Sequence, residues 1–397
     1  MHNVTRRTPA VRSIGLCLLL VLAAAWAGTA AQPEYAVIIV IDGFRNDYME
    51  LYDTPNLHEL AKEGVRFEAA TGVFPSNSTV NQTSLVTGAY PETTGIPNNS
   101  RYDRNADRII EPLRDNRAVT VARAFRDAGL RTASVSHYML ERDVDLYSRN
   151  LGEGLLWLRG NSPPNLFVYL NLAVDEAGHG GGPFSARTAE AVAQADAEVG
   201  IILDTLRARG IYDKTVIVVV SDHGMSPADG QPIRPTLEYQ MWAHGFTVAK
   251  DNAAIRADTD IVQIQHGSAF LYLRDGRFDT QREEELLAAL RQIVGAVVYD
   301  REALRELHTD PDLVGDIVVA PAAGYTLYPG RANSGIHGRP AESQIALILS
   351  GPGIRKGVTL GEAEIVDVVP TLLALFDLPL PATVDGRVLT EALEPSS

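Results

Sequence analysis

Three runs of apolar residues that lead into acidic residues constrain the fold of this chain most strongly. They are "YAVIIVIDG" (35–43), "NLFVYLNLAVDEAGH" (165–179) and "KTVIVVVSDHGM" (214–225). Near-continuous apolar runs of this length are typical of parallel strands that are buried on both faces of a sheet. Ligands of such sheets bind beyond the carboxyl ends of the strands. We therefore expect Asp42, Asp175 and Asp222 to lie at one shared edge of the sheet.

Amphipathic segments between these runs predict helices. Two examples are "AVTVARAFRDAG" (118–129) and "ARTAEAVAQADAEVGIILDTLRARG" (186–210), and each ends in a Gly suited to a C-cap. Strands that alternate with helices indicate an α/β fold with a mostly parallel sheet. With 397 residues, 45% of them hydrophobic, the chain is long enough for one large domain and an elaboration.

The pattern changes between about residues 236 and 311. The segments "SAFLYLRDG" (268–276), "REEELLAALRQIVG" (282–295) and "REALRELH" (301–308) indicate a small α+β insertion. The main pattern then resumes with "GDIVVAPAAGYTL" and "QIALILSGPG", followed by a helix in "IVDVVPTLLALFDLPLP". We therefore predict a core in two parts, 32–235 and 312–397, with the insertion or cap at 236–311 between them.

The first 31 residues have the order of regions found in a secretory signal peptide. A basic start with Arg6, Arg7 and Arg12 precedes the apolar run "SIGLCLLLVLAAAWAG", and the small residues "TAA" offer a cleavage site near Ala31. The alternative is a retained N-terminal anchor, but the apolar run is short for a membrane span. Residues 1–31 are thus predicted to direct export to the periplasm or the outside of the cell, leaving no transmembrane segment after cleavage.

Composition restricts the chemistry that the mature chain can use. The only cysteine, Cys17, lies in the apolar run, so a bound metal must be held by His, Asp and Glu. The formal charge is −15, and no basic run opposes it, so we expect no surface for nucleic acid. An anionic substrate would need local positive charge, which bound metal ions supply.

Six residues form a candidate metal site. Each by itself has an ordinary structural explanation, as a helix cap or a solvated loop histidine. Together they offer three carboxylates and three imidazoles, mostly at strand ends or in loops that contain glycine. Three ligands per ion with an open position suit catalytic zinc, and two neighbouring ions suit phosphoryl transfer. The residues are Asp42, Asp175, His179, Asp222, His223 and His337.

The motifs around these residues resemble those of the nucleotide pyrophosphatase/phosphodiesterase family, within the alkaline phosphatase superfamily. They are "VIDG", "TGAYPETTGIPNNSRYD", "DEAGH", "SDHGM", "GIHG" and "DVVPTLLALFDLP", and the similarity extends from Ile38 to about Leu389. The resemblance implies an alkaline-phosphatase-like three-layer sandwich. It also implies two Zn²⁺ ions, although other divalent ions fit the same residue types. One ion would be held by Asp42, Asp222 and His223, and the other by Asp175, His179 and His337.

The resemblance also implies roles in the stretch "FPSNSTVNQTSLVTG" (74–88) and just beyond it. Counting back nine residues from Thr87 places the nucleophile at Ser78, with Thr79 as its main rival. Counting forward twelve places at Asn99 the side chain that binds a phosphoryl oxygen. One metal would activate Ser78 to form a phosphoseryl intermediate, and the other would stabilise the leaving oxygen. Thr79 stands where nucleotide-cleaving members carry an aromatic residue, so stacking on a nucleobase is not implied.

These features predict a metal-dependent hydrolase that cleaves phosphodiester or pyrophosphate bonds in a small phosphate-ester substrate. The alternative is a phosphomonoesterase or phosphonate hydrolase with the same site, in which His137 or Arg142 would supply the extra positive charge. An inactive binding protein is a third hypothesis. The leaving group and the oligomeric state are not predicted. Candidates to line the leaving-group side are His244, His266, Trp242, Phe246, Tyr325 and Tyr328.

Overall fold

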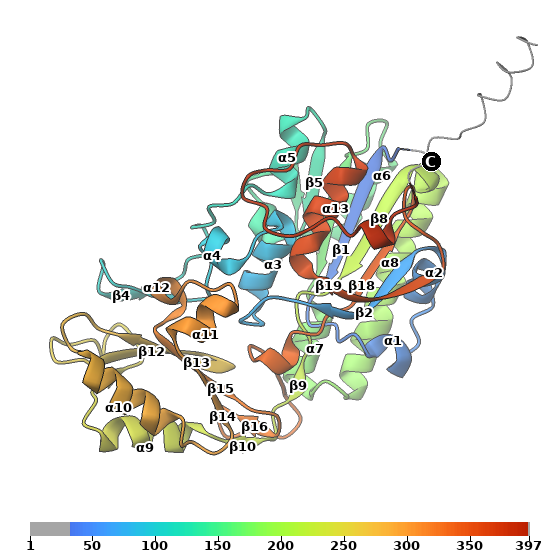
Figure 1. Cartoon of the computed structure of the whole chain (residues 1–397). Coiled ribbons are helices and arrows are strands. Elements are labelled where there is room, and N and C mark those ends of the chain that lie inside the picture. Colours follow the sequence, from blue (N-terminus) through green and yellow to red (C-terminus); the bar gives the residue numbers. More distant parts are fainter. Residues whose placement is uncertain (1–31, 396–397) are drawn as a thin grey trace, which may run out of the picture.

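The computed structural model describes residues 32–395. The predicted signal peptide, 1–31, lies outside the described residues, as does Cys17. The described chain forms two lobes, each built around its own sheet (Figure 1). Within residues 32–395, no helix is both long and apolar enough to cross a membrane.

The larger sheet has eight strands in the order β19-β2-β18-β8-β1-β7-β5-β6. All of them run in the same direction except β18, which is antiparallel to both of its neighbours. The prediction of a mostly parallel sheet is therefore confirmed. The strand bounds are β1 (Tyr35–Ile41), β2 (Val65–Thr71), β5 (Thr132–Val135), β6 (Leu146–Ser148), β7 (Leu166–Asn171), β8 (Thr215–Val220), β18 (Leu347–Ser350) and β19 (Val358–Glu364).

Helices cover both faces of this sheet, which gives the three layers expected of the fold. Alternate residues of β1 belong to two different apolar cores, so the strand is apolar throughout. One face packs against α3 (Ser78–Thr87), α5 (Val121–Asp127) and α13 (Val368–Leu375). The other packs against α2 (Pro55–Glu63), α6 (Leu151–Arg159) and α8 (Ala186–Arg209).

The second sheet forms the lower-left lobe of Figure 1 and has the order β11-β12-β13-β15-β14. Its helices α9 (Arg234–Ala243) and α10 (Thr280–Leu290) pack on one face. The other face packs against α11 (Arg301–Glu306), α12 (Pro311–Val314) and two aromatic residues of the first lobe, Phe74 and Tyr102. The strands are β11 (Val248–Ala249), β12 (Ile261–His266), β13 (Ser268–Leu273), β14 (Ala296–Tyr299) and β15 (Ile317–Pro321).

One expectation about the strands is wrong. The segment "GDIVVAPAAGYTL" contains β15, which pairs with β13 and β14 in the second sheet, and the main sheet resumes only at β18. Both sheets are covered on both faces, so a strand of either one is a continuous apolar run. The apolar pattern alone therefore does not reveal which sheet a strand joins.

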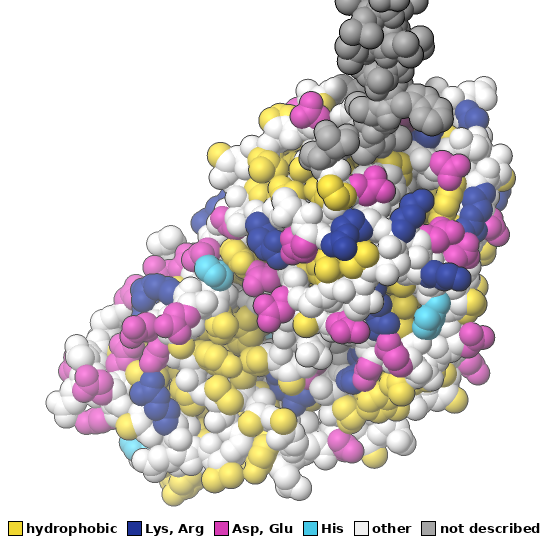
Figure 2. All heavy atoms as spheres, turned by 45° about the vertical axis from the view of Figure 1, so that its right-hand side comes forward, with side chains coloured by type: hydrophobic (Ala, Val, Ile, Leu, Met, Phe, Trp, Pro, Cys, Tyr) yellow, Lys and Arg dark blue, Asp and Glu magenta, His cyan; other side chains and the backbone are white. Residues whose placement is uncertain are grey.

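Charged side chains of both signs are interspersed over the face of the molecule shown in Figure 2, and the formal charge of the whole chain is −15. This face carries no segregated basic area of the kind that binds a polyanion. On this face, positive charge is available to an anionic substrate only from single side chains.

The turn between β12 and β13 joins the second lobe to the first. Ser268 Oγ donates a hydrogen bond to the backbone oxygen of Gly338 at 3.0 Å. Gly267 has φ +71°, and a Cβ atom added there would lie 2.0 Å from the backbone oxygen of His337. Only glycine permits this close approach of the two backbones.

We expect Gly267→Ala to destabilise the protein by about 3 kcal/mol, because the new methyl group adds a steric clash to an unfavourable positive φ. Gly276→Ala is the matched control, since Gly276 has φ +74° but nothing within 4 Å of the added Cβ. The control should cost about 1 kcal/mol. Equal losses in denaturant unfolding would show that the turn does not press on the His337 backbone.

Candidate metal and phosphoryl-transfer site

The main sheet brings the three predicted Asp residues to one edge. Strands β8, β1 and β7 are neighbours, and their carboxyl ends point the same way. Asp42 directly follows β1, and its backbone N–H donates to the Asn171 oxygen at the end of β7 at 2.9 Å. Asp222 is the second residue after β8, and Asp175 follows β7. The sheet topology thus accounts for the convergence of residues far apart in sequence.

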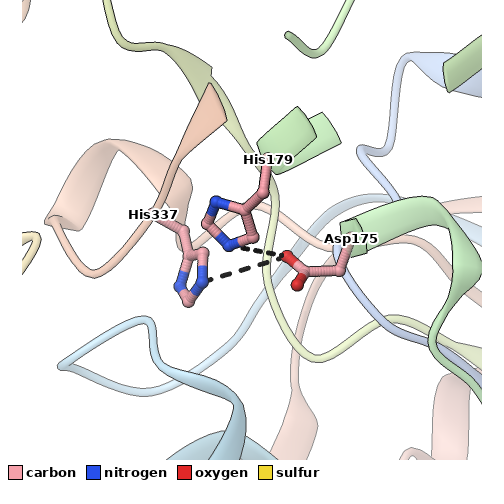
Figure 3. A group of neighbouring side chains, drawn as sticks. All are labelled: Asp175, His179 and His337. Carbon is pink, nitrogen blue, oxygen red and sulfur yellow. Dashed lines mark ion pairs between the residues drawn. The ribbon is translucent and has the colours of Figure 1, made fainter. Parts of the chain in front are cut away.

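Asp175 and His179 lie on one helix, a placement that the sequence pattern did not specify. The helix is α7 (Ala173–Gly181), and the two residues are four positions apart, so their side chains project from one face. His179 Nε2 lies 3.4 Å from Asp175 Oδ1. His337, which follows the short strand β17 (Gly335–Ile336), brings its Nε2 to 3.9 Å from the same oxygen. Figure 3 shows these three side chains converging, and we name them the His337 group.

The other three predicted ligands, the His223 group, are Asp42, Asp222 and His223, and all are buried. His223 Nε2 lies 3.3 Å from Asp42 Oδ1 and 3.8 Å from Asp222 Oδ2. However, the ligand atoms around His223 that lie close enough together to share one ion belong to Asp42, Asp175 and His223, and not to Asp222. Asp175 therefore lies between the two groups. The rings of His223 and His337 stack with their centroids 3.8 Å apart, which makes the two groups one continuous site.

Each of the three histidines is oriented by a backbone carbonyl. The Nδ1 atom lies within hydrogen-bond distance of a carbonyl oxygen, and a carbonyl can only accept, so Nδ1 carries the proton. Nε2 is therefore the nitrogen of each ring that faces the carboxylates and is available to bind a metal ion. The pairs are His223 with Gly224 at 2.8 Å, His179 with Gly335 at 2.9 Å and His337 with Ser76 at 2.9 Å.

Electrostatics oppose so many buried charges without a metal ion. Burial and the neighbouring Asp222 carboxylate raise the pKa of Asp42 well above its ordinary value, and burial raises the pKa of Asp175. Burial acts to lower the pKa of His223, but Asp222 and Asp42 outweigh it and raise this pKa to about 10. Burial and the charge of His223 lower the pKa of His337 well below its ordinary value. Burial and the mutual proximity of these groups therefore shift their pKa values strongly.

The residue types fit divalent metal ions. Asp42 Oδ1 and Asp175 Oδ1 are buried and accept no hydrogen bond from residues 32–395. Each group offers both carboxylate oxygens and imidazole nitrogens, a donor set suited to zinc. Unpaired buried acceptors beside oriented imidazoles are what a metal ion would satisfy.

Ser78 lies next to the His223 group. It is the first residue of α3, and its Oγ is 3.1 Å from His223 Nε2. Thr79 is the next residue of the same helix, and its backbone oxygen accepts a hydrogen bond from Thr83 Oγ1 at 2.6 Å. Asn99, His179 and His337 all line one cavity. The Oδ1 atom of Asn99 has no hydrogen-bond partner in the described chain. The structure therefore places Ser78 and Asn99 near the two metal-ligand groups.

His137 and Arg142 lie in different environments. His137 has no exposed surface, and burial lowers its pKa to about 4, so the ring is neutral at physiological pH. Arg142 is exposed.

Gln82 is a site residue that sequence reasoning missed. Its Nε2 donates to Asp42 Oδ2 at 2.9 Å and to Asp222 Oδ2 at 3.0 Å, so one amide bridges the two carboxylates. Backbone N–H groups of Gly43 and His223 bind the other oxygen of Asp222. Gln82 is four residues after Ser78 on the same face of α3, and that spacing is the one feature of the sequence that points to it.

Comparisons with known proteins identify the family of the chain. The sequence model of the family described as type I phosphodiesterase/nucleotide pyrophosphatase matches residues 36–341. Bis(5'-adenosyl)-triphosphatase ENPP4 of Bos taurus is 28% identical over 221 residues, which cover 50% of this chain and about half (49%) of that protein. The human ectonucleotide pyrophosphatase/phosphodiesterase family member 7 is 25% identical over 428 residues, covering 97% of this chain and 89% of the relative.

Solved structures show the same fold. Murine ectonucleotide pyrophosphatase/phosphodiesterase 5 superposes with a TM-score of 0.71 at 21% identity, covering 91% of this chain and 100% of that one. An inactive variant of the murine protein in complex with AMP gives a TM-score of 0.69 at 22% identity, covering 87% of this chain and 96% of that one.

We expect Gln82→Leu to weaken the binding of one zinc ion by about 10- to 100-fold, because the bridging amide no longer orients Asp42 and Asp222. The second ion, at the His337 group, should bind as before. Gln194→Leu, on the exposed surface of α8, is the matched control and should leave both affinities unchanged. Competition with a chelator measures the affinities of both zinc ions. Unaltered zinc binding in Gln82→Leu would contradict a supporting role for the amide.

Zinc binding should strengthen as pH rises from about 6.5 to about 8.5. His223 is protonated across this range in the metal-free protein, since its pKa is about 10, and an ion must displace that proton. Each proton displaced gives about a tenfold gain in affinity per pH unit. Calorimetric titration in buffers with different ionisation enthalpies measures the proton release. A zinc affinity that does not change with pH would refute displacement at His223.

Proposed function

Because the chain belongs to the type I phosphodiesterase/nucleotide pyrophosphatase family, within the alkaline phosphatase superfamily, we propose that it is an exported two-zinc hydrolase acting through Ser78. It would cleave phosphodiester or pyrophosphate bonds in small phosphate esters. The observation that carries the proposal is the 3.1 Å approach of Ser78 Oγ to His223, beside two groups of oriented metal ligands.

Asp42, Asp222 and His223 would hold one ion, and Asp175, His179 and His337 the other. When bound, the ions supply positive charge to the attacking and leaving oxygens. Gln82 fixes the outer oxygens of Asp42 and Asp222, and three carbonyls fix the imidazole rings. The residues of the chain thus arrange the ligands before a substrate arrives.

Ser78 would act as the nucleophile. Its Oγ forms a bond to phosphorus, its proton leaves to solvent, and the electron pair of the broken P–O bond goes to the leaving oxygen. Water then cleaves the phosphoserine and restores the hydroxyl group. Backbone N–H groups in the first turn of α3 and the Asn99 side chain would bind the non-bridging oxygens.

The neutral state of His137 favours a diester over a monoester. A phosphomonoester carries one more negative charge, and its hydrolysis would need an additional cation at the site. Of the two candidates, His137 is buried with its pKa lowered to about 4 and offers no charge, and Arg142 is exposed. We therefore keep phosphomonoesterase or phosphonate hydrolase activity as the second hypothesis. The relatives named for adenosine substrates support a nucleotide-type diester, whereas Thr79 provides no aromatic face for a base.

Ser78→Ala should lower kcat for bis-p-nitrophenyl phosphate by at least about 1000-fold, because no covalent intermediate can form. Ser84→Ala is the matched control. Ser84 is a buried serine of the same helix whose hydroxyl has no partner among the described residues, so its loss should leave turnover intact. The zinc-loaded control should also prefer this diester to p-nitrophenyl phosphate.

Three results would contradict the proposal. Full diester activity in Ser78→Ala would exclude the covalent route through Ser78. Loss of diester activity in Thr79→Val, but not in Ser78→Ala, would identify Thr79 as the nucleophile. A preference for p-nitrophenyl phosphate would instead favour the phosphomonoesterase hypothesis.

A further inference from the structure

A cavity of about 450 Å³ opens beside the His337 group and is not explained by the metal ligands. Asn77, Asn99, His179 and His337 form its inner wall. The outer wall comes from the β12–β13 turn and from the segment 326–331 that follows the second sheet. The volume lies within the range of sites that hold small organic ligands. Ser78 and the His223 group do not line it.

The position of this cavity assigns it to the leaving group, provided that the proposed function holds. In-line displacement requires the leaving oxygen to lie opposite the attacking one. Ser78 Oγ lies at His223, whereas the cavity borders His179 and His337. As the bond from Oγ to phosphorus forms, the broken P–O bond leaves its electron pair on an oxygen that faces this cavity.

The charge of the lining is unusual for so acidic a chain. No Asp or Glu lines the cavity, although the chain has 50 of them against 35 Lys and Arg. Arg331 lines it and carries a permanent positive charge. The described lining is therefore suited to a ligand that carries negative charge next to Arg331.

The backbone around Arg331 is held against the first lobe. A Cβ atom added at Gly330 would lie 1.5 Å from the Ala228 backbone oxygen, so the two backbones are in close contact. Ala228 N–H donates to the Ser334 oxygen at 2.9 Å, and Ser334 Oγ donates to the Arg331 oxygen at 3.0 Å. The fold thus fixes where the Arg331 side chain leaves the backbone.

The neighbouring aromatic residue is also positioned. Tyr328 lines the cavity, its hydroxyl donates to Gln265 Oε1, and the Arg234 guanidinium lies 5.0 Å from its ring centroid. Arg234 is itself paired with Glu238 at 2.7 Å and is not among the cavity residues. Arg331 is therefore the arginine left to meet a ligand in this cavity.

We propose that this cavity binds a phosphate-bearing leaving group and that Arg331 recognises its negative charge. The shared chemistry is a terminal phosphate or diphosphate, whether as free pyrophosphate or as part of a nucleoside diphosphate. Arg331 binds the leaving group and determines specificity, and it takes no part in bond cleavage.

Three substrates that transfer the same thymidylyl group test this. Thymidine 5'-(p-nitrophenyl phosphate) releases a nitrophenolate, thymidine 5'-triphosphate releases pyrophosphate, and P1,P3-dithymidine triphosphate releases a nucleoside diphosphate. We expect Arg331→Gln to lower kcat/KM for the two phosphate-releasing substrates by about 10- to 100-fold, and to change that for the aryl ester less than about twofold. A loss with one of the phosphate-releasing substrates alone identifies which source the cavity takes.

Two further variants sharpen the result. Arg331→Lys should retain part of the preference, because it keeps the charge but not the planar fork. Arg123→Gln, an exposed arginine of α5, removes the same charge far from the cavity lining and should change none of the three rates. Zinc content is measured for every variant, so that a loss of metal is not mistaken for a loss of recognition.

Equal losses on all three substrates, or no loss on any, would overturn the inference while leaving the proposed hydrolysis standing. No turnover of any substrate by the zinc-loaded wild-type chain would refute the proposed function and this inference with it.

Discussion

The structure depends on the meeting of three carboxylates at one edge of the main sheet. Like charges about 4 Å apart near a protein surface repel by about 4 kcal/mol, and Asp42 and Asp222 are buried as well. A chain that packs them together needs compensating positive charge. Without bound metal, part of this positive charge comes from the proton on His223. We propose that two metal ions supply the positive charge instead. The bridging amide of Gln82 donates hydrogen bonds to two of the carboxylates, and the three oriented imidazoles direct their Nε2 atoms toward the carboxylates.

The sequence was sufficient for the parts of the site that strands position. Apolar runs ending in Asp predicted that Asp42, Asp175 and Asp222 would converge, since neighbouring parallel strands end at one edge. The sequence did not predict the positions of residues that a helix or the second sheet holds in place. The pattern did not reveal that Asp175 and His179 share α7, that β15 leaves the main sheet, or that Gln82 bridges two ligands, because each depends on a tertiary contact.

The second lobe bears on the chemistry through two contacts with the first. Its β12–β13 turn presses on the backbone of His337, and the segment that follows its last strand closes the cavity beside the His337 group. Of the residues considered from sequence for this side, His266 and Tyr328 line the cavity. Phe246 and Tyr325 pack in or against the apolar core of the second lobe, and Trp242 and His244 are exposed. Arg331, which no pattern singled out, is the charged residue there.

Zinc-edge anomalous diffraction from crystals of the zinc-loaded chain locates each bound ion directly. Two separate peaks are expected, one contacting Asp42, Asp222 and His223, and the other contacting Asp175, His179 and His337. The positions of the side chains also permit a different grouping, in which Asp42, Asp175 and His223 share one ion. A single peak at that shared position, with none at His179 and His337, would contradict the two-ion site and the mechanism built on it.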